Sequence, residues 1–488
     1  MTTFIMIAQL ITALALLVFV HELGHFFAAR MFKMRVPKFY LFFNPSISLV
    51  RCKKFNGKWH FKFFGKNLPE TLTEVDANGN PVLDEKGKPK QKMLDLSSLP
   101  DDDWRKYPES TEYGLGWLPL GGYCQISGMI DETQSVENLP SEPQPYEYRY
   151  KPAWQRLITI LGGIIVNLVV GILLFAMVIG KYEKQYIRNE AVTDGIYAYQ
   201  AARDMGFQTG DRIISVNGKK IERFIDAVSP KIYFGATVQV ERDGVQKDIV
   251  IGEDAYRLLK ERIPFIDMSN CPALIDSVLP EGNAYQAGLQ KGDKILAIND
   301  SIITSSWGSL TENIRRFPNQ PIQITYLREG DTAHLEVATD VLGLIGIKPH
   351  VPYPLKSYSV GQTIVYGWQD AMTSLIINVK GLGKVISGKE KARESLTGPI
   401  GMAKIYGGEW IWRKFWSLTA LISVVLAFMN ILPIPGLDGG HAIFATIELI
   451  TRRKISDKVL QYAQTVGMFI LILFMVFVIG NDIFKLFK

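Results

Sequence analysis

The sequence predicts an α-helical integral membrane protein with four transmembrane helices, a membrane-associated β-loop after the first helix, and two tandem α+β domains after the second. The first observation is a set of four uncharged, strongly apolar stretches, at 2–20, 157–180, 415–437 and 459–481. Each is close to the roughly 20 residues that a helix needs to cross a hydrocarbon core. The second observation is that the rest of the 488-residue chain is ordinary polar sequence, and the third is an internal repeat.

Basic residues predict the orientation of the four stretches. Ten of them follow stretch one, precede stretch two or separate stretches three and four: Arg30, Lys33, Arg35, Lys38, Lys151, Arg156, Arg452, Arg453, Lys454 and Lys458. Such flanks stay on the cytoplasmic side, which makes the β-loop cytoplasmic and the segment 181–411 and both termini periplasmic. The rule is satisfied by balance, because Lys181, Lys184, Arg413 and Lys414 lie on the other side. We therefore expect a multi-pass protein of the cell inner membrane.

The first stretch is expected to be a retained helix, because it lacks the basic start and the small-residue cleavage site of a signal peptide. The cytoplasmic region that follows it has two parts rich in aromatic and β-branched residues, 40–65 and 113–129, which predict strands at the membrane surface. Between them, around 66–112, lies an insertion whose central part is polar and lacks a core-forming period. An acidic, proline-containing linker at 131–152 leads into the second stretch.

The repeat lies between stretches two and three. "MGFQTGDRIISVNG" at 205–218 is matched by "AGLQKGDKILAIND" at 287–300, so that Gly206, Gly210, Asp211 and Asn217 recur as Gly288, Gly292, Asp293 and Asn299. Turn, short apolar strand and turn follow in the same order, which indicates a duplicated small domain. The repeated run resembles PDZ domains of bacterial envelope proteases, which bind extended peptides at a sheet edge. For the first copy, a role as a spacer or steric shield is an equal alternative.

A metal-binding motif closes the first stretch. In "HELGH", His21 and His25 are one helical turn apart and project from one face. Two imidazoles at this spacing can chelate one zinc ion, and Glu22 can act as general base on a metal-bound water. Ionisable groups at membrane depth usually serve a function. The competing interpretation is a hydrogen-bonded polar cluster between helices.

A catalytic zinc site needs a third protein ligand and an open position. The candidates lie in "NILPIPGLDGGHAIF", where two prolines break the third span before Asp438, and His441 follows three residues later. Both spans run from outside to inside, so these groups and the histidines reach a similar depth. Chemistry alone does not choose between Asp438 and His441.

Other features carry less information. A net charge of +6 suits a protein that faces anionic lipid, and no nucleic-acid motif is present. The three cysteines form no metal-binding pattern. Gly162, Gly163 and Asn167 in the second stretch fit either a functional role or simple close packing of helices.

Taken together, "HELGH", "GG-x-x-x-N", "N-x-x-P-x-P-x-L-D-G" and the tandem PDZ-like repeat resemble the site-2 protease family, over nearly the whole chain. The resemblance implies a zinc (Zn²⁺) centre with His21, His25 and Asp438 as ligands and with Glu22 as the catalytic glutamate. It favours Asp438 over His441. It also implies substrate binding by Asn430 and by the β-loop segment 119–128, whose predicted contacts are Gly121, Gly122 and Tyr123.

The function expected from the resemblance is intramembrane proteolysis of single-span membrane proteins such as trimmed anti-sigma factors and remnant signal peptides, with the bilayer as the other partner. The alternatives are a non-catalytic membrane scaffold, which would not need Glu22, and a metal transporter, which should show inverted repeats. The expected regions are 1–32 with HELGH, 33–153 for the β-region, 154–182, 190–260 and 265–345 for the PDZ-like domains, 355–411 for an amphipathic segment, 412–440 with the LDG motif, and 456–486.

Overall fold

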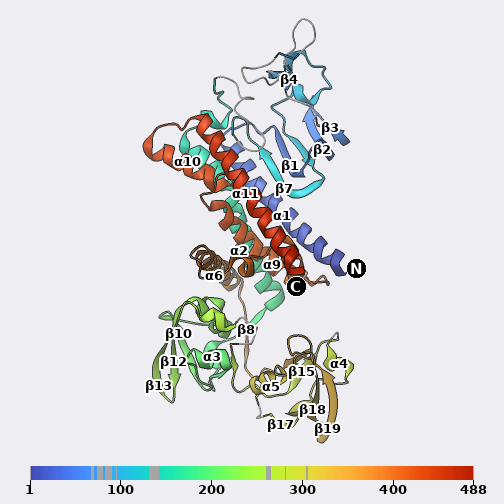
Figure 1. Cartoon of the computed structure of the whole chain (residues 1–488), viewed down its shortest axis with the longest axis vertical. Helices are drawn as coiled ribbons and strands as arrows, with labels where there is room; N and C mark the ends of the chain where they lie inside the picture. Colours follow the sequence, from blue (N-terminus) through green and yellow to red (C-terminus); the bar gives the residue numbers. More distant parts are fainter. Residues whose placement is uncertain are drawn as a thin grey trace. The chain divides into compact units, whose positions relative to one another are not determined.

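The computed structural model divides into two compact units, one formed by residues 1–178 and 364–488 and the other by 179–363, shown in Figure 1. We call them unit 1 and unit 2 and describe each by itself. The structure describes residues 2–67, 71–73, 81–82, 91–94, 96–130, 142–259, 265–280, 282–303 and 306–486. Most of the predicted polar insertion and the first half of the acidic linker therefore lie outside the described residues.

Unit 1 contains the predicted membrane helices. Among the described residues, four helices are long and apolar enough to cross a bilayer. They are α1 (Thr2–Met31), α2 (Ala153–Val178, with a π-helical turn to Glu183), α9 (Trp412–Ile431) and α11 (Asp457–Leu486). The four apolar stretches of the sequence thus correspond to four helices. Helices α1, α2 and α9 contact one another.

Two helix boundaries position the polar motifs. Helix α1 continues past the apolar stretch through HELGH, so His21 and His25 lie on one continuous helix. Helix α9 ends at Ile431, earlier than the predicted stretch, because Pro433 and Pro435 cannot continue it. A further helix, α10 (Asp438–Thr451), which the sequence did not predict, starts at Asp438. The third span and the LDG motif are therefore separated by a short turn.

The β-region of unit 1 is a five-stranded sheet of order β3-β2-β6-β1-β7. Its strands are β1 (Lys38–Phe43), β2 (Ile47–Phe55), β3 (Lys58–Lys66), β6 (Glu112–Leu115) and β7 (Leu118–Gln125). Strands β1 and β6 are parallel, and the other pairs are antiparallel. Buried residues of β1 and β7, Phe39 and Cys124, pack with Ala29 at the end of α1. This packing holds the edge strand β7 beside the HELGH helix.

Unit 1 also contains smaller elements, in the insertion and in the segment that precedes α9. Within the insertion, β4 (Thr71–Thr73) pairs with β5 (Gln91–Met93). The predicted amphipathic segment contains α6 (Val360–Ile386, which begins at the end of unit 2), α7 (Ala392–Ser395) and α8 (Pro399–Tyr406). Asp482 of α11 accepts hydrogen bonds from Gly398 N at 3.0 Å and Gly401 N at 2.9 Å. The first turn of α8 is thereby capped by a buried carboxylate.

Unit 2 repeats one set of elements. One four-stranded sheet has the order β11-β10-β12-β13, and the other has the order β17-β16-β18-β19. The first comprises β10 (Arg212–Val216), β11 (Lys219–Lys220), β12 (Ala236–Arg242) and β13 (Val245–Ile251); the second comprises β16 (Lys294–Ile298), β17 (Ser301–Ile302), β18 (Pro321–Arg328) and β19 (Asp331–Ala338). The short helices α3 (Gln200–Asp204) and α4 (Asn283–Gln286) precede them.

The repeated aspartates form equivalent ion pairs in the two copies. Asp211 pairs with Arg242 at 2.7 Å, and Asp293 pairs with Arg328 at 2.7 Å. The copies differ in the connection that precedes β12 in the first copy and β18 in the second. The second copy has helix α5 (Trp307–Ile314) there, and the first has two short 3₁₀ turns. The two-strand pairs β9–β14, β15–β20 and β8–β21 complete unit 2; their bounds are β8 Gln185–Ile187, β9 Ile196–Ala198, β14 Ile266–Met268, β15 Ile275–Val278, β20 Ile347–Pro349 and β21 Leu355–Ser357.

Candidate metal centre

Three side chains from α1 and α10 converge in unit 1. Asp438 Oδ2 lies 3.1 Å from His21 Nε2 and 3.4 Å from His25 Nε2. The two Nε2 atoms are 3.2 Å apart, and all three ligand atoms lie within 4.8 Å of one another. The residues predicted as ligands are therefore brought together. His441 lines the same cavity but is outside this group of converging atoms among the described residues.

Helix α2 orients the two imidazoles. His25 Nδ1 lies 3.0 Å from the carbonyl oxygen of Thr159, which can accept its N–H and so leaves the Nε2 lone pair facing Asp438. The side-chain amide of Asn167 lies 3.2 Å from His21 Nδ1. An acceptor such as the Thr159 carbonyl fixes the tautomer and ring orientation of a metal-binding histidine, whereas Asn167 holds the His21 ring in position.

Close approach of α1 and α2 makes these contacts possible. A Cβ on Gly24 would lie 2.3 Å from the carbonyl oxygen of Gly162. A Cβ on Gly163 would lie 2.5 Å from His25 Nε2 and 2.6 Å from His21 Cε1. The sequence left open whether Gly162 and Gly163 have a functional role or only allow close packing of helices. The structure is consistent with both, because Gly162 lies against α1 and Gly163 lies against the two imidazoles.

The residues present fit a zinc ion. Two imidazole nitrogens and one carboxylate oxygen form a donor set that zinc accepts, with one position left for water or substrate. The Oδ2 atom of Asp438 is buried, and it faces the Nε2 atoms of both histidines. A buried carboxylate oxygen of this kind needs a compensating charge. A cation at the point where the three atoms converge would supply it.

Glu22 and strand β7 lie beside this centre. Glu22 lines a cavity of about 180 Å³ together with His21, His25 and Asp438, which we call the metal cavity. It also lines a second cavity of about 450 Å³, the β7 cavity. A Cβ on Gly122 would lie 3.6 Å from Glu22 Cγ, so the backbone of β7 passes close to this glutamate.

The predicted substrate-binding residues line the same two cavities. Asn430 lines both, and its Nδ2 lies 3.4 Å from His21 Nε2. Gly121 and Gly122 line the β7 cavity, whereas Tyr123 lines the metal cavity. Strand β7 pairs with β1 on one side and stands at the edge of the sheet. The rest of the β7 cavity is largely apolar and includes residues of α9 and α11.

The sequence model of Peptidase family M50 matches residues 9–65 and 104–474, which is most of the chain. This chain belongs to family M50. The match leaves out 66–103, most of the stretch where the sequence predicts an insertion. The resemblance to the site-2 proteases is confirmed, and this M50 chain is a protease.

Relatives of this M50 protease include an enzyme whose name refers to the regulation of sigma-E. This chain is 28% identical to "Protease RseP" of Yersinia pestis and 26% identical to "Regulator of sigma-E protease RseP" of Escherichia coli, with 98% of both chains covered in each case. It is 28% identical to a relative from Treponema pallidum whose name includes the words zinc metalloprotease, over 79% of this chain and 90% of the relative.

Three residues of α2 lie against the two histidines, and the sequence identified none of them clearly. Thr159 was not considered, while Gly163 and Asn167 had a packing alternative of equal weight. All three recur at intervals of four along α2, a spacing that places them on roughly one helix face. Gly163 and Asn167, four residues apart like His21 and His25, were the available signal, whereas Thr159 acts through its carbonyl oxygen, which its residue type does not reveal.

Proposed function

We propose that this family M50 protease is a zinc-dependent intramembrane endopeptidase that cleaves the transmembrane segments of single-span proteins, such as trimmed anti-sigma factors and remnant signal peptides. The observation that carries the proposal is the convergence of His21, His25 and Asp438 beside Glu22, on helices that are apolar enough to lie in a bilayer. A metal-binding group and a base at this depth suit hydrolysis of a bond that is otherwise buried in lipid.

Zinc, when held by His21, His25 and Asp438, would polarise the scissile carbonyl and lower the pKa of a bound water. Glu22 accepts the proton of the attacking water and passes it to the leaving amine. Thr159 and Asn167 keep the two imidazoles in the orientation that holds the ligand atoms together. The metal cavity has room for the attacking water beside the peptide group.

Substrate binding is proposed to use the edge of the sheet. A helical substrate hides its amides in internal hydrogen bonds, so it must unwind before its backbone can be attacked. Strand β7 pairs only with β1 in the described structure, and an unwound segment could add to its other edge. Asn430, which lines both cavities, would hold the substrate backbone near the metal. The apolar wall of the β7 cavity suits the side chains of a former transmembrane helix.

The two repeated domains of unit 2 are proposed to be PDZ domains that restrict access to substrates whose outer part has been trimmed. Their support is the shared order of turns and strands and the repeated Asp–Arg pairs. The proposed location is the cell inner membrane, with unit 2 and both termini periplasmic and the β-region cytoplasmic, on the distribution of basic residues.

Glu22→Gln tests the catalytic role. The amide cannot accept the proton, so the variant should retain zinc and lose cleavage of a single-span substrate by several orders of magnitude. Zinc content and turnover of the purified variant measure the two effects separately. Undiminished turnover would remove Glu22 from the mechanism. Loss of cleavage with normal metal content also argues against a transporter, in which a base beside the metal has no role.

A further inference from the structure

A separate small cavity lies within the β-region of unit 1. It holds about 80 Å³ and is lined by residues of the five-stranded sheet and of the turn Trp104–Lys106. Its charged lining consists of four cations and one carboxylate: Lys38, Arg51, Lys62, Arg105 and Glu112. We call it the basic cavity. Neither the catalytic mechanism nor the metal site uses it.

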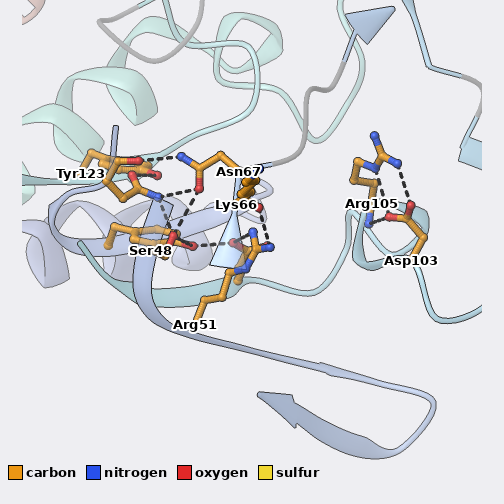
Figure 2. Close-up of polar contacts among 10 residues, drawn as sticks. Ser48, Arg51, Lys66, Asn67, Asp103, Arg105 and Tyr123 are labelled. Carbon is orange, nitrogen blue, oxygen red and sulfur yellow. Dashed lines mark hydrogen bonds and ion pairs between the residues drawn. The ribbon is translucent and has the colours of Figure 1, made fainter. Parts of the chain in front are cut away.

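The acidic groups at the basic cavity already have partners. Glu112 Oε1 accepts a hydrogen bond from the Tyr40 hydroxyl at 2.5 Å and lies 3.5 Å from Arg51 Nη1. Asp103, next to the lining, accepts three hydrogen bonds from Arg105, two of them from its side chain, as Figure 2 shows. The negative charges are thus neutralised locally. With Arg51 and Arg105 paired in this way, Lys62 still gives the cavity an excess of positive charge.

Arg51 supplies a buried donor that lacks an acceptor. The residue is only 7% exposed, and its Nη2 donates to the carbonyl oxygen of Lys66 at 2.9 Å. Its Nε is buried and has no hydrogen-bond partner in the described residues. A buried donor on an ionised group that stays unsatisfied is costly. An acceptor within the cavity would relieve that cost.

We infer that the basic cavity binds a phosphate group. Its volume of about 80 Å³ is several times the roughly 10–15 Å³ that a cavity needs to hold one water molecule, so there is room for a small oxyanion. Guanidinium and ammonium groups form their strongest hydrogen bonds with such oxyanions. Lys62 is half-buried, and its Nζ lies 4.8 Å from the ring centre of Trp104, in a cation–π contact that holds the ammonium at the cavity.

The surface next to the cavity indicates where a phosphate group could come from. Trp59, Phe61 and Phe63 alternate with Lys62 along β3 and are 51%, 61% and 68% exposed. Alternate side chains of a strand point to opposite faces. The aromatic side chains therefore lie on the opposite face of β3 from Lys62. A strand with an exposed aromatic face and a basic cavity on its other side suits the headgroup region of a bilayer, where a lipid phosphate is at hand. Free inorganic phosphate has the same chemistry.

The cavity is connected to the edge strand by hydrogen bonds. Tyr123 of β7 donates from its hydroxyl to Asn44 Oδ1 at 3.0 Å, and Asn44 donates to Ser48 Oγ at 3.0 Å. The Ser48 hydroxyl lies 3.3 Å from the Tyr40 hydroxyl, which in turn donates to Glu112. Figure 2 shows the part of this network around Tyr123 and Ser48. Because Tyr123 lines both the basic cavity and the metal cavity, a bound phosphate would stabilise the network that holds β7 in place.

Equilibrium dialysis of the purified full-length chain in detergent with ³²P-labelled inorganic phosphate tests the inference. The wild-type chain should bind it saturably, and Lys62→Gln should weaken binding about tenfold or more, because it removes a charge-assisted contact. Lys58→Gln is the matched control, since Lys58 is exposed on the same strand and is outside the cavity lining. The control should bind phosphate as the wild type does.

Competition distinguishes the two sources. Displacement of the label by phosphatidylglycerol in mixed micelles would identify a lipid headgroup as the ligand, whereas failure to displace it would identify soluble phosphate. Non-saturable binding to the wild type would overturn the inference, and so would equal affinities of the Lys62→Gln and wild-type chains. The measurement involves no cleavage, so its outcome is independent of the proposed proteolysis.

Discussion

Replacement of Gly163 by alanine tests how closely α2 must approach the two histidines of the proposed metal centre. The added Cβ would lie 2.5 Å from His25 Nε2 and 2.6 Å from His21 Cε1. Non-bonded heavy atoms prefer separations of about 3.5 Å or more, so the methyl group must displace one or both rings by roughly 1 Å. Displacement of this size can cost about 100-fold in activity, and disturbed orientation of ligands costs about 10–100-fold in metal affinity.

The assay measures both effects on purified protein. Zinc retained against a graded series of chelator concentrations gives the metal affinity, and cleavage of a single-span reporter gives the activity. Gly480→Ala is the matched control, because it also adds a methyl group to a spanning helix but meets no atom within 4 Å. We expect a loss of affinity and turnover in Gly163→Ala alone. Wild-type zinc affinity and turnover in Gly163→Ala would refute the argument that this glycine is required by the histidines.

Three further predictions follow from other parts of the chain. Asp438→Ala should lower zinc content per protein, as measured by mass spectrometry of the metal, whereas His441→Ala should not; the reverse order would make His441 the third ligand. Deletion of about 195–340 should leave cleavage of a short, trimmed substrate largely intact and should permit premature cleavage of a substrate with a bulky outer domain. If a stable deletion protein cleaved neither substrate, the repeated domains could not act only as a steric filter. Burial raises the pKa of Cys271 to about 12. A thiol reagent should therefore leave Cys271 unlabelled at pH 8 and react with it as the pH approaches 12 or when the protein unfolds. Rapid labelling of Cys271 at pH 8, detected by peptide mapping, would contradict this.

The elements that could be predicted from the sequence are those with a local cause. The four apolar stretches predicted four helices because a long uncharged run has few other stable conformations. The spacing of His21 and His25 predicted a shared helix face for the same local reason. The prolines predicted a break in the third span before Asp438, but helix α10 itself was not predicted, and its N-cap residue Leu437 makes no side-chain capping hydrogen bond that would mark its start. Continuous hydropathy does not distinguish one helix from a helix followed by a turn.

The choice between Asp438 and His441 shows what local patterns lack. Both residues can bind zinc, and they are three positions apart. The geometry favours Asp438, because the turn between α9 and α10 brings it within 3.4 Å of both histidines, while His441 lies one turn further along α10. The direction of that turn depends on how the chain packs after α9 ends, and no periodicity in the sequence encodes it.

The orienting groups on α2 depend on the register of two helices, which a single segment cannot reveal. Thr159 and Asn167 lie eight residues apart, and they meet His25 and His21, which are four apart, so α2 runs antiparallel to α1 past the metal centre. Gly163 lies midway between them, next to Gly162, where a Cβ on Gly24 would be only 2.3 Å from the Gly162 carbonyl oxygen. A larger residue there would increase the separation of the helices and weaken both orienting contacts together. The separation of the two helices at one crossing therefore controls the orientation of both imidazoles, so close packing there is a physical requirement of the proposed metal binding.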